Sequence, residues 1–268
     1  MNKKYTIIIL IFLLVITIKT EAGLVLNTRL CHIYEIGKKE ILTGKIKLKN
    51  TSNQKIKVRL YKRDYTFNFR GENFYKEPAT LKRSNATWVK LDRNNVILKA
   101  KQKKNVSYRV KIPSRDGLRG TYWSMIMVEE IPLRISVNND NQVNMYQNVR
   151  YGIQVITNFQ EKGKLKLHFQ DPSFKKLEND QYFFTVNVFN KGITAINSKT
   201  RIILVDKASG KVLNKFKQEY ARIFPDSSIK VKQKFNLTDK KEYRIIILIG
   251  NNERGYNGQK YMVAVDNN

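Results

Sequence analysis

The chain has 268 residues, of which 41% are hydrophobic and 27% are charged. This composition excludes disorder of the whole chain, and the length suggests two domains of ordinary size. Lysine and arginine number 51 against 22 acidic residues, a formal net charge of +29, so the surface attracts anionic partners without identifying one.

The N-terminus has the three features of a secretory signal peptide. Lys3 and Lys4 precede an apolar run from Thr6 to Ile18, and small residues follow at 20–22. We expect a signal peptide over residues 1–22 and therefore an exported protein, either periplasmic or at the cell surface. An uncleaved anchor is the alternative, but the apolar run is shorter than a spanning helix needs, and no later segment is apolar enough to cross a membrane.

The first half of the mature chain alternates apolar and polar residues with the period of a β-strand. Residues 24–34 predict an edge or bridging strand that contains Cys31, the single cysteine, so no internal disulfide can form. Residues 42–48 and 56–60 predict strands with cationic outer faces. The segment Phe67–Arg83 has mixed polarity, with Gly71 and Pro78, and is expected to be a loop.

Two further runs organise this half of the chain. In Val106–Ile112 apolar residues alternate with Ser107, Arg109 and Lys111 before Pro113 ends the run, and Thr121–Glu129 forms a second alternating run after Gly117 and Gly120. We interpret the two runs as the core hairpin of an immunoglobulin-like sandwich. Residues 148–158 then predict a strand after a long asparagine-rich loop.

The second half repeats the pattern and contains no helix with an apolar stripe. Seven alternating runs lie between Leu165 and Val265, the number expected of a small sandwich. Charge and a glycine at residues 161–163 mark a boundary. The predicted fold class is all-β, with two tandem immunoglobulin-like sandwiches, residues 23–160 and 161–268, after a signal peptide at residues 1–22.

The order of these elements resembles the two-domain PapD-like periplasmic chaperones of pilus and fimbrial assembly. The strongest match is the run MVEEIP at residues 127–132, which in that family ends the strand before the long loop. The resemblance implies that the strand after this loop is lent to a client subunit, and that Arg29 holds the client's terminal carboxylate. The implied client-binding residues are therefore Arg29, Asn148, Val149, Arg150, Tyr151, Ile153 and Val155.

Two observations set this chain apart within that resemblance. The family's second cation, a lysine, falls on Ile153 in the simplest alignment, and the nearest cation, Arg150, has the opposite strand parity. The same early strands, together with Tyr151-Gly152-Ile153, are also similar to the WxL-interacting proteins of Gram-positive surfaces, which bind cell-wall polymer and a surface protein.

The sequence contains none of the common catalytic or cofactor-binding motifs. There is no nucleophile elbow around Ser124 and no metal-ligand spacing around His32 or His168, so we expect no enzyme activity, no metal site and no cofactor. The lysines are dispersed over both halves of the chain, which argues against a specific nucleic-acid partner.

Two functions follow as hypotheses. The first is an exported chaperone-like protein that binds a secreted or surface protein subunit by strand addition. The alternative is a cell-envelope scaffold or adhesin whose cationic sheet faces bind an anionic surface polymer.

Overall fold

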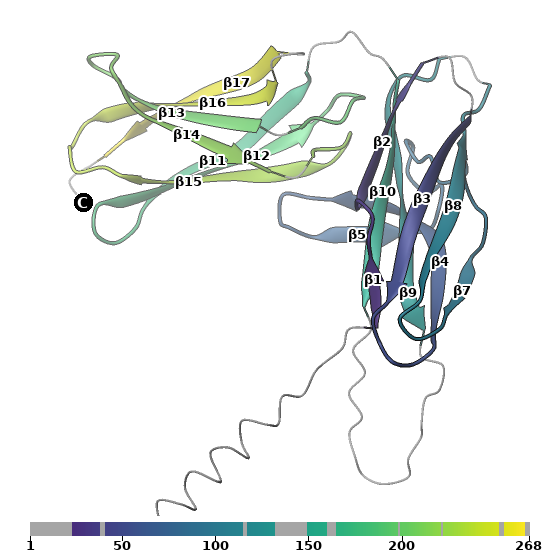
Figure 1. Cartoon of the computed structure of the whole chain (residues 1–268). Helices are drawn as coiled ribbons and strands as arrows, with labels where there is room; N and C mark the ends of the chain where they lie inside the picture. The colour runs from purple at the N-terminus through teal and green to yellow at the C-terminus, as the bar shows by residue number, and fades with distance from the viewer. Residues whose placement is uncertain are drawn as a thin grey trace, which may run out of the picture.

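The computed structural model describes residues 23–37, 41–114, 117–131, 149–159, 165–197, 199–220, 222–251 and 255–265. The predicted signal peptide, the asparagine-rich loop and the boundary at residue 160 lie outside these ranges. The described residues form two β-sandwiches arranged as an L (Figure 1), which confirms the predicted all-β fold of tandem immunoglobulin-like domains. Within the described residues, no helix is long and apolar enough to cross a membrane.

The first sandwich contains two sheets that face each other across one core. One sheet has the order β1-β3-β8-β6, and the other has the order β2-β10-β9-β4-β5, with β7 also paired to β4. The strands are β1 (Leu24–Leu26), β2 (Cys31–Ile36), β3 (Ile41–Asn50), β4 (Ile56–Phe67), β5 (Asn73–Lys76), β6 (Val89–Leu91), β7 (Asn95–Leu98), β8 (Lys103–Lys111), β9 (Gly120–Ile131) and β10 (Arg150–Phe159).

The predicted bridging strand is confirmed as two short strands that join different sheets. β1 pairs antiparallel with β3, and after a bend at residues 27–30 the chain continues as β2, which pairs parallel with β10 in the opposite sheet. The side chain of His32, on β2, contacts the opposite sheet, since its Nδ1 lies 2.5 Å from the hydroxyl of Tyr108 on β8. The bend therefore ties the two sheets together at one side of the sandwich.

The predicted core hairpin is wrong. β8 pairs with β3 and β6, whereas β9 pairs with β4 and β10 in the other sheet, so the chain crosses the sandwich between Ile112 and Arg119. Alternation shows that each run is a strand with one buried face, but it carries no information about which strand lies beside it.

The predicted loop at Phe67–Arg83 is also wrong in its first part. β4 continues to Phe67, and β5 returns beside it to form a hairpin whose turn contains Gly71 with φ of 85°. The side-chain oxygen of Asn68 accepts a hydrogen bond from the backbone N–H of Arg70 (2.9 Å) and stabilises this turn. The hairpin extends from the first sandwich toward the second (Figure 1).

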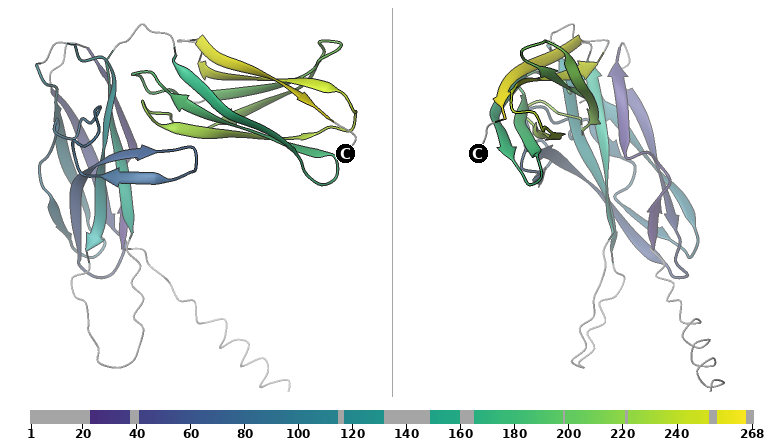
Figure 2. Two further views of the ribbon diagram at one scale, coloured as in Figure 1. Left: turned by 180° about the vertical axis from the view of Figure 1, so that it is seen from behind. Right: turned by 90° about the vertical axis from the view of Figure 1, so that its left-hand side faces the viewer.

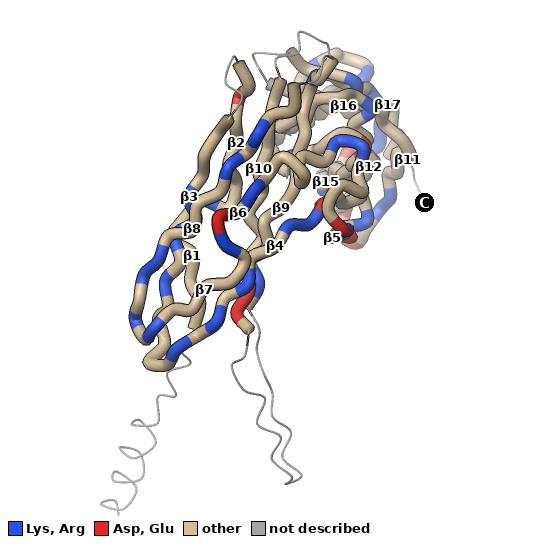
Figure 3. The backbone as a smooth tube through the Cα atoms, turned by 90° about the vertical axis from the view of Figure 1, so that its right-hand side faces the viewer, with Lys and Arg blue, Asp and Glu red and all other residues tan. Residues whose placement is uncertain are grey.

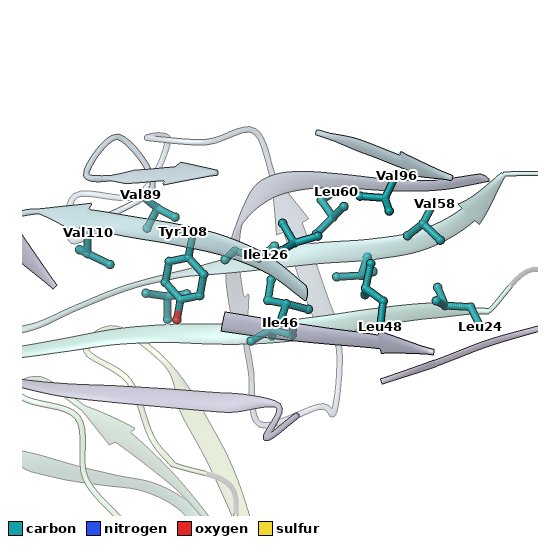
Figure 4. Close-up of a cluster of buried hydrophobic side chains, with 14 of the residues drawn as sticks. Leu24, Ile46, Leu48, Val58, Leu60, Val89, Val96, Tyr108, Val110 and Ile126 are labelled. Carbon is teal, nitrogen blue, oxygen red and sulfur yellow. The ribbon is translucent and has the colours of Figure 1, made fainter. Parts of the chain in front are cut away.

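The first core consists of inward residues from every strand of the sandwich except β5, whose four residues are exposed (Figure 4). Alternation predicts these positions correctly, because one residue in two faces inward along β3 and β8. The fully buried members include Ile46, Leu60, Val110, Ile126, Ile153 and Val155.

The second sandwich pairs a three-stranded sheet, β11-β12-β15, with a four-stranded sheet, β14-β13-β16-β17 (Figure 2). Its core includes Phe184, Val186, Val231, Ile245 and Ile247. The seven strands occur where the sequence predicted them: β11 (Leu167–Lys176), β12 (Gln181–Asn190), β13 (Lys199–Asp206), β14 (Val212–Glu219), β15 (Ser228–Asn236), β16 (Glu242–Asn251) and β17 (Gly255–Ala264).

Candidate functional site

Strand β10 is covered by neighbours on both sides only along its second half. β9 pairs with β10 along its whole length, but β2 begins at Cys31, opposite Gln154. The N–H of Gln154 donates to the carbonyl oxygen of Leu30 (2.8 Å), immediately before β2. Among the described residues, no strand pairs with the outer side of residues 150–153.

The direction of the free backbone groups follows from the Gln154 contact. Successive residues of a strand direct their N–H and C=O groups to opposite sides. The backbone groups of Gly152 and Arg150 therefore face the same side as those of Gln154. The N–H and C=O groups of Tyr151 and Ile153 face β9 instead. Within the described ranges, Gly152 and Arg150 therefore present backbone donors and acceptors that no strand pairs with, as an edge strand does.

Along β10, the odd-numbered side chains predicted to contact a client lie on the face that packs on the first core. Ile153 and Val155 are fully buried in the first core, and Tyr151 packs against the same core with its hydroxyl donating to the carbonyl of Leu24 (2.9 Å). Val149 is half-buried. That these side chains contact a client stays a prediction, and a client could reach Ile153 or Val155 only if this core opened.

Arg29 lies in the bend between β1 and β2, and its side chain is exposed. It precedes Leu30, the residue that accepts the hydrogen bond from β10. The structure therefore brings Arg29 to the point where the unpaired edge of β10 meets the start of β2. Asn148, the remaining predicted residue, lies outside the described residues.

Arg150 is engaged in a cluster of charged groups across β4, β9 and β10. Its Nε lies 2.8 Å from Oε2 of Glu129. Arg59, on β4, binds the other carboxylate oxygen of Glu129. The hydroxyl of Tyr61 also donates to Glu129 (3.1 Å). Burial alone would raise the pKa of Glu129, but the hydrogen bonds from Arg59 and Tyr61 and the two arginine charges outweigh it and hold this pKa below its ordinary value.

The two sandwiches meet in a small apolar cluster on the outer face of β9. Trp123 stacks on Phe224 of the second sandwich with ring centroids 4.6 Å apart, and Ile156 completes the buried centre. Phe67 at the end of β4 contacts Phe224 edge-on. A fully buried contact of this kind fixes the position of the second sandwich beside β9 and β10.

Backbone hydrogen bonds reinforce this junction at the start of β9. The N–H of Thr121 donates to the carbonyl of Ile193 (2.8 Å), and the hydroxyl of Thr121 accepts from the N–H of Ala195 (2.9 Å). Gly120 has φ of 75°, and a Cβ at this position would collide with the Ile193 carbonyl. Glycine is therefore required here both by its backbone conformation and by the close approach of the second sandwich.

The hairpin β4–β5 forms a second contact between the sandwiches. Phe69, in its turn, packs edge-on against Phe189, and its N–H donates to the hydroxyl of Ser228 (3.0 Å). The ammonium of Lys230 lies 5.5 Å from the centre of the Phe69 ring. The junction therefore has two separate supports, one at Trp123 and one at the hairpin.

Arg222 enters the junction from the second sandwich beside Cys31 of β2. Its Nη1 lies 3.5 Å from Sγ of Cys31, and its Nε donates to the side chain of Asn197 (2.9 Å). Arg222 lines a cavity of about 140 Å³ that also contains Glu35. Sequence reasoning did not identify Arg222, because nothing in the local pattern of the second half indicates which residue faces the first sandwich.

No family model matches the chain, and no curated protein matches it. A chain of the solved structure described as "Chaperone-tip adhesin complex is vital for synergistic activation of CFA/I fimbriae biogenesis" is 11% identical with a TM-score of 0.50, and the alignment covers 91% of this chain and 100% of that chain. The class 5 fimbriae chaperone CfaA is 13% identical with a TM-score of 0.47, covering 89% and 98%.

A chain of the CsuC–CsuE chaperone–tip adhesion subunit complex from Acinetobacter baumannii is 14% identical with a TM-score of 0.44, covering 90% and 98%. At these identities the likeness concerns the fold and not the client, and only the first superposition reaches a TM-score of 0.5. The chain has the two-domain fold of the PapD-like fimbrial chaperones.

Proposed function

We propose that this protein is an exported chaperone-like module that binds a protein subunit by adding a client strand to the outer edge of β10. The observation that carries the proposal is the edge at residues 150–153, beside which no described strand lies and which ends at Arg29. Edge strands bind extended segments through their backbone groups, so Gly152 and Arg150 would supply the hydrogen bonds. The chaperone–tip adhesin complex with the similar fold supports a subunit as the kind of partner.

The geometry favours a parallel client strand. β2 runs parallel to β10 and occupies the edge from Gln154 onward, so a parallel client strand beside residues 150–153 would run toward the bend and end there. Its terminal carboxylate would then meet the guanidinium of Arg29, with which it can form a charge-assisted pair. An antiparallel client would instead bring its ammonium group to Arg29, and the like charges would repel.

The experiment that tests the proposal is capture of partners by tagged mature protein from its native envelope fraction in high salt, which screens contacts between exposed charges. We expect one stoichiometric β-rich protein to be retained by the wild type and lost by Arg29→Ala. Arg93→Ala is the matched control, because Arg93 is an exposed arginine whose nearest carboxylate oxygen lies 3.7 Å away. Equal retention by both variants would contradict the role of Arg29.

Amide exchange on the purified complex tests the edge itself. Strand addition protects the N–H groups of Gly152 and Arg150, which have no described partner, and leaves Ile153 unchanged because it already faces β9. Unchanged exchange at Gly152 in the complex would rule out strand addition at this edge.

Export is part of the same proposal. Residues 1–22 would be removed as a signal peptide, leaving domains at 23–160 and 161–268. N-terminal sequencing of the protein from the envelope fraction should begin at Gly23, and an intact Met1 would contradict cleavage.

A further inference from the structure

The outward face of the sheet β1-β3-β8-β6 carries seven cations among uncharged side chains. Strand register places alternate residues of β3 and β8, with one residue of β6, on this face, which lies away from the second sandwich (Figures 1 and 3). No acidic residue occurs among the residues that these strands direct outward. The cations of this face are Lys45, Lys47, Lys49, Lys90, Lys103, Arg109 and Lys111.

Like charges stand directly opposite each other at two positions on this face. Lys49 pairs with Lys103, and Lys90 pairs with Arg109. Like charges opposite each other on neighbouring strands destabilise a sheet, so folding stability does not account for them. None of these seven cations forms an ion pair within the described residues. The carboxylates that do form ion pairs there bind other lysines and arginines.

The middle of the face alternates cations with uncharged hydrogen-bonding side chains. Lys45 lies opposite Ser107, and Lys47 lies opposite Asn105, which gives two successive pairs of one charge and one hydroxyl or amide. Residues two apart on a strand are about 7 Å apart, so these pairs form a regular row along the sheet. Such a row fits a linear polymer that carries both anionic groups and hydroxyls.

A shallow hollow of about 220 Å³ continues this row between β6 and β8. Its lining consists of Lys90, Leu91, Asp92, Ser107, Tyr108 and Arg109. The carboxylate of Asp92 faces its own neighbour, because Nε of Arg93 lies 3.7 Å away. The hollow therefore has two cations and one carboxylate in its lining, and the Ser107 hydroxyl lies among them, whereas the Tyr108 hydroxyl is bonded to His32 and Tyr34.

We propose that this face binds a linear acidic polysaccharide, with carboxylates at the lysines and sugar hydroxyls at Ser107 and Asn105. The polar partners distinguish this ligand from a polymer that offers charge alone, since they would have no role there. The site lies on the sheet opposite β10, so it is independent of the proposed client edge, and its failure would leave the client proposal intact.

The test measures binding of the mature protein to polygalacturonate, with inorganic polyphosphate and neutral dextran as comparison polymers. We expect polygalacturonate to bind, with affinity falling as salt rises, and dextran not to bind. Lys45→Gln with Lys47→Gln should lower the affinity about tenfold, because each exposed charge contributes up to about 1 kcal/mol and 1.4 kcal/mol is a factor of ten.

The matched control removes two exposed cations elsewhere, with Lys232→Gln and Lys234→Gln on β15 of the second sandwich. This control should change the affinity less than twofold. An equal loss in both double variants would show binding by net charge alone and would overturn the site.

A second pair of variants tests the chemistry of the ligand. Ser107→Ala with Asn105→Ala keeps every charge, and we expect it to weaken binding of polygalacturonate without affecting polyphosphate. If polyphosphate binds the wild type as tightly as polygalacturonate, and this variant weakens neither, the face does not select a polysaccharide and the proposal fails.

Discussion

Arg150 and Glu129 lie directly opposite each other on β10 and β9, with Nε of the arginine 2.8 Å from Oε2 of the carboxylate. The side chain of Glu129 is 4% exposed, whereas that of Arg150 is 55% exposed. The pair fixes the first residue of β10 against β9, at the end of the strand where β2 is absent. It therefore helps to hold the unpaired edge in an extended form that a client strand can join.

Glu129→Gln should destabilise the first sandwich. The substitution removes the charge that Arg59 and Arg150 both bind, so we expect the free energy of unfolding to fall by about 2 kcal/mol at pH 7, as urea denaturation would measure. Because the pKa of Glu129 lies below its ordinary value, the folded state favours the ionised form. This contribution is present above the carboxylate's unfolded pKa and is lost as the pH falls through its folded value.

The matched control is Glu77→Gln, which removes the same charge from an ion pair with Arg63 at the surface. Its carboxylate is 74% exposed, so the change should be below about 0.5 kcal/mol. Equal effects of the two substitutions would mean that the buried position of Glu129 contributes nothing.

Much of the fold could be predicted from the sequence because strand periodicity is local. Alternation located β3, β8 and all seven strands of the second sandwich, and the lack of a helical stripe fixed the class. The pairing of β8 and β9 could not be predicted, since two consecutive alternating runs have the same pattern whether they form a hairpin or face each other across a core.

The candidate site was predictable only in part. The roles of Arg29 and of the strand predicted at residues 148–158 came from the resemblance, and the structure brings Arg29 and β10 to one edge. Alternation at Ile153 and Val155 was interpreted as a set of side chains for a client, although the same alternation describes a strand that faces its own core. The contacts of Gly120 and Phe224 depend on how the sandwiches meet, which no local pattern encodes.

Ile153→Ala should therefore act on stability and not on client binding. Ile153 is fully buried, and removal of its side chain leaves a cavity, so we expect a loss of about 2–4 kcal/mol in the free energy of unfolding. Ile97→Ala on β7 is the control, since Ile97 is 50% exposed and should lose less than about 1 kcal/mol. If folded Ile153→Ala protein loses the captured partner while remaining stable, its side chain contacts the client directly.

Gly120→Ala should loosen the junction between the sandwiches. Both Gly120 and Gly117 have positive φ values, 75° and 83°, but a Cβ at Gly117 meets no atom within 4 Å, whereas one at Gly120 collides with the carbonyl of Ile193. Gly117→Ala therefore has only the backbone cost, about 1 kcal/mol, and Gly120→Ala should cost at least about 1 kcal/mol more.

Small-angle scattering separates the two variants of this pair. We expect a larger radius of gyration for Gly120→Ala, because the hydrogen bond from Thr121 to Ile193 cannot form at its present length. Gly117→Ala should match the wild type. Identical scattering from all three proteins would show that the junction does not depend on this close approach.

His32 joins the bend near Arg29 to the opposite sheet through the hydroxyl of Tyr108. Burial lowers the pKa of His32 from its ordinary value near 6.5, and the charge of Arg29 lowers it further against the effect of a backbone hydrogen bond. The unfolded chain therefore binds a proton more readily than the folded chain. The free energy of unfolding should fall as the pH drops below about 6.5, because the unfolded state then takes up more protons than the folded state.

Urea denaturation between pH 8 and pH 5.5, above the range of most carboxylates, should show this slope in the wild type and in His168→Gln, and a much smaller slope in His32→Gln. An unchanged slope in His32→Gln would assign the pH dependence to another group.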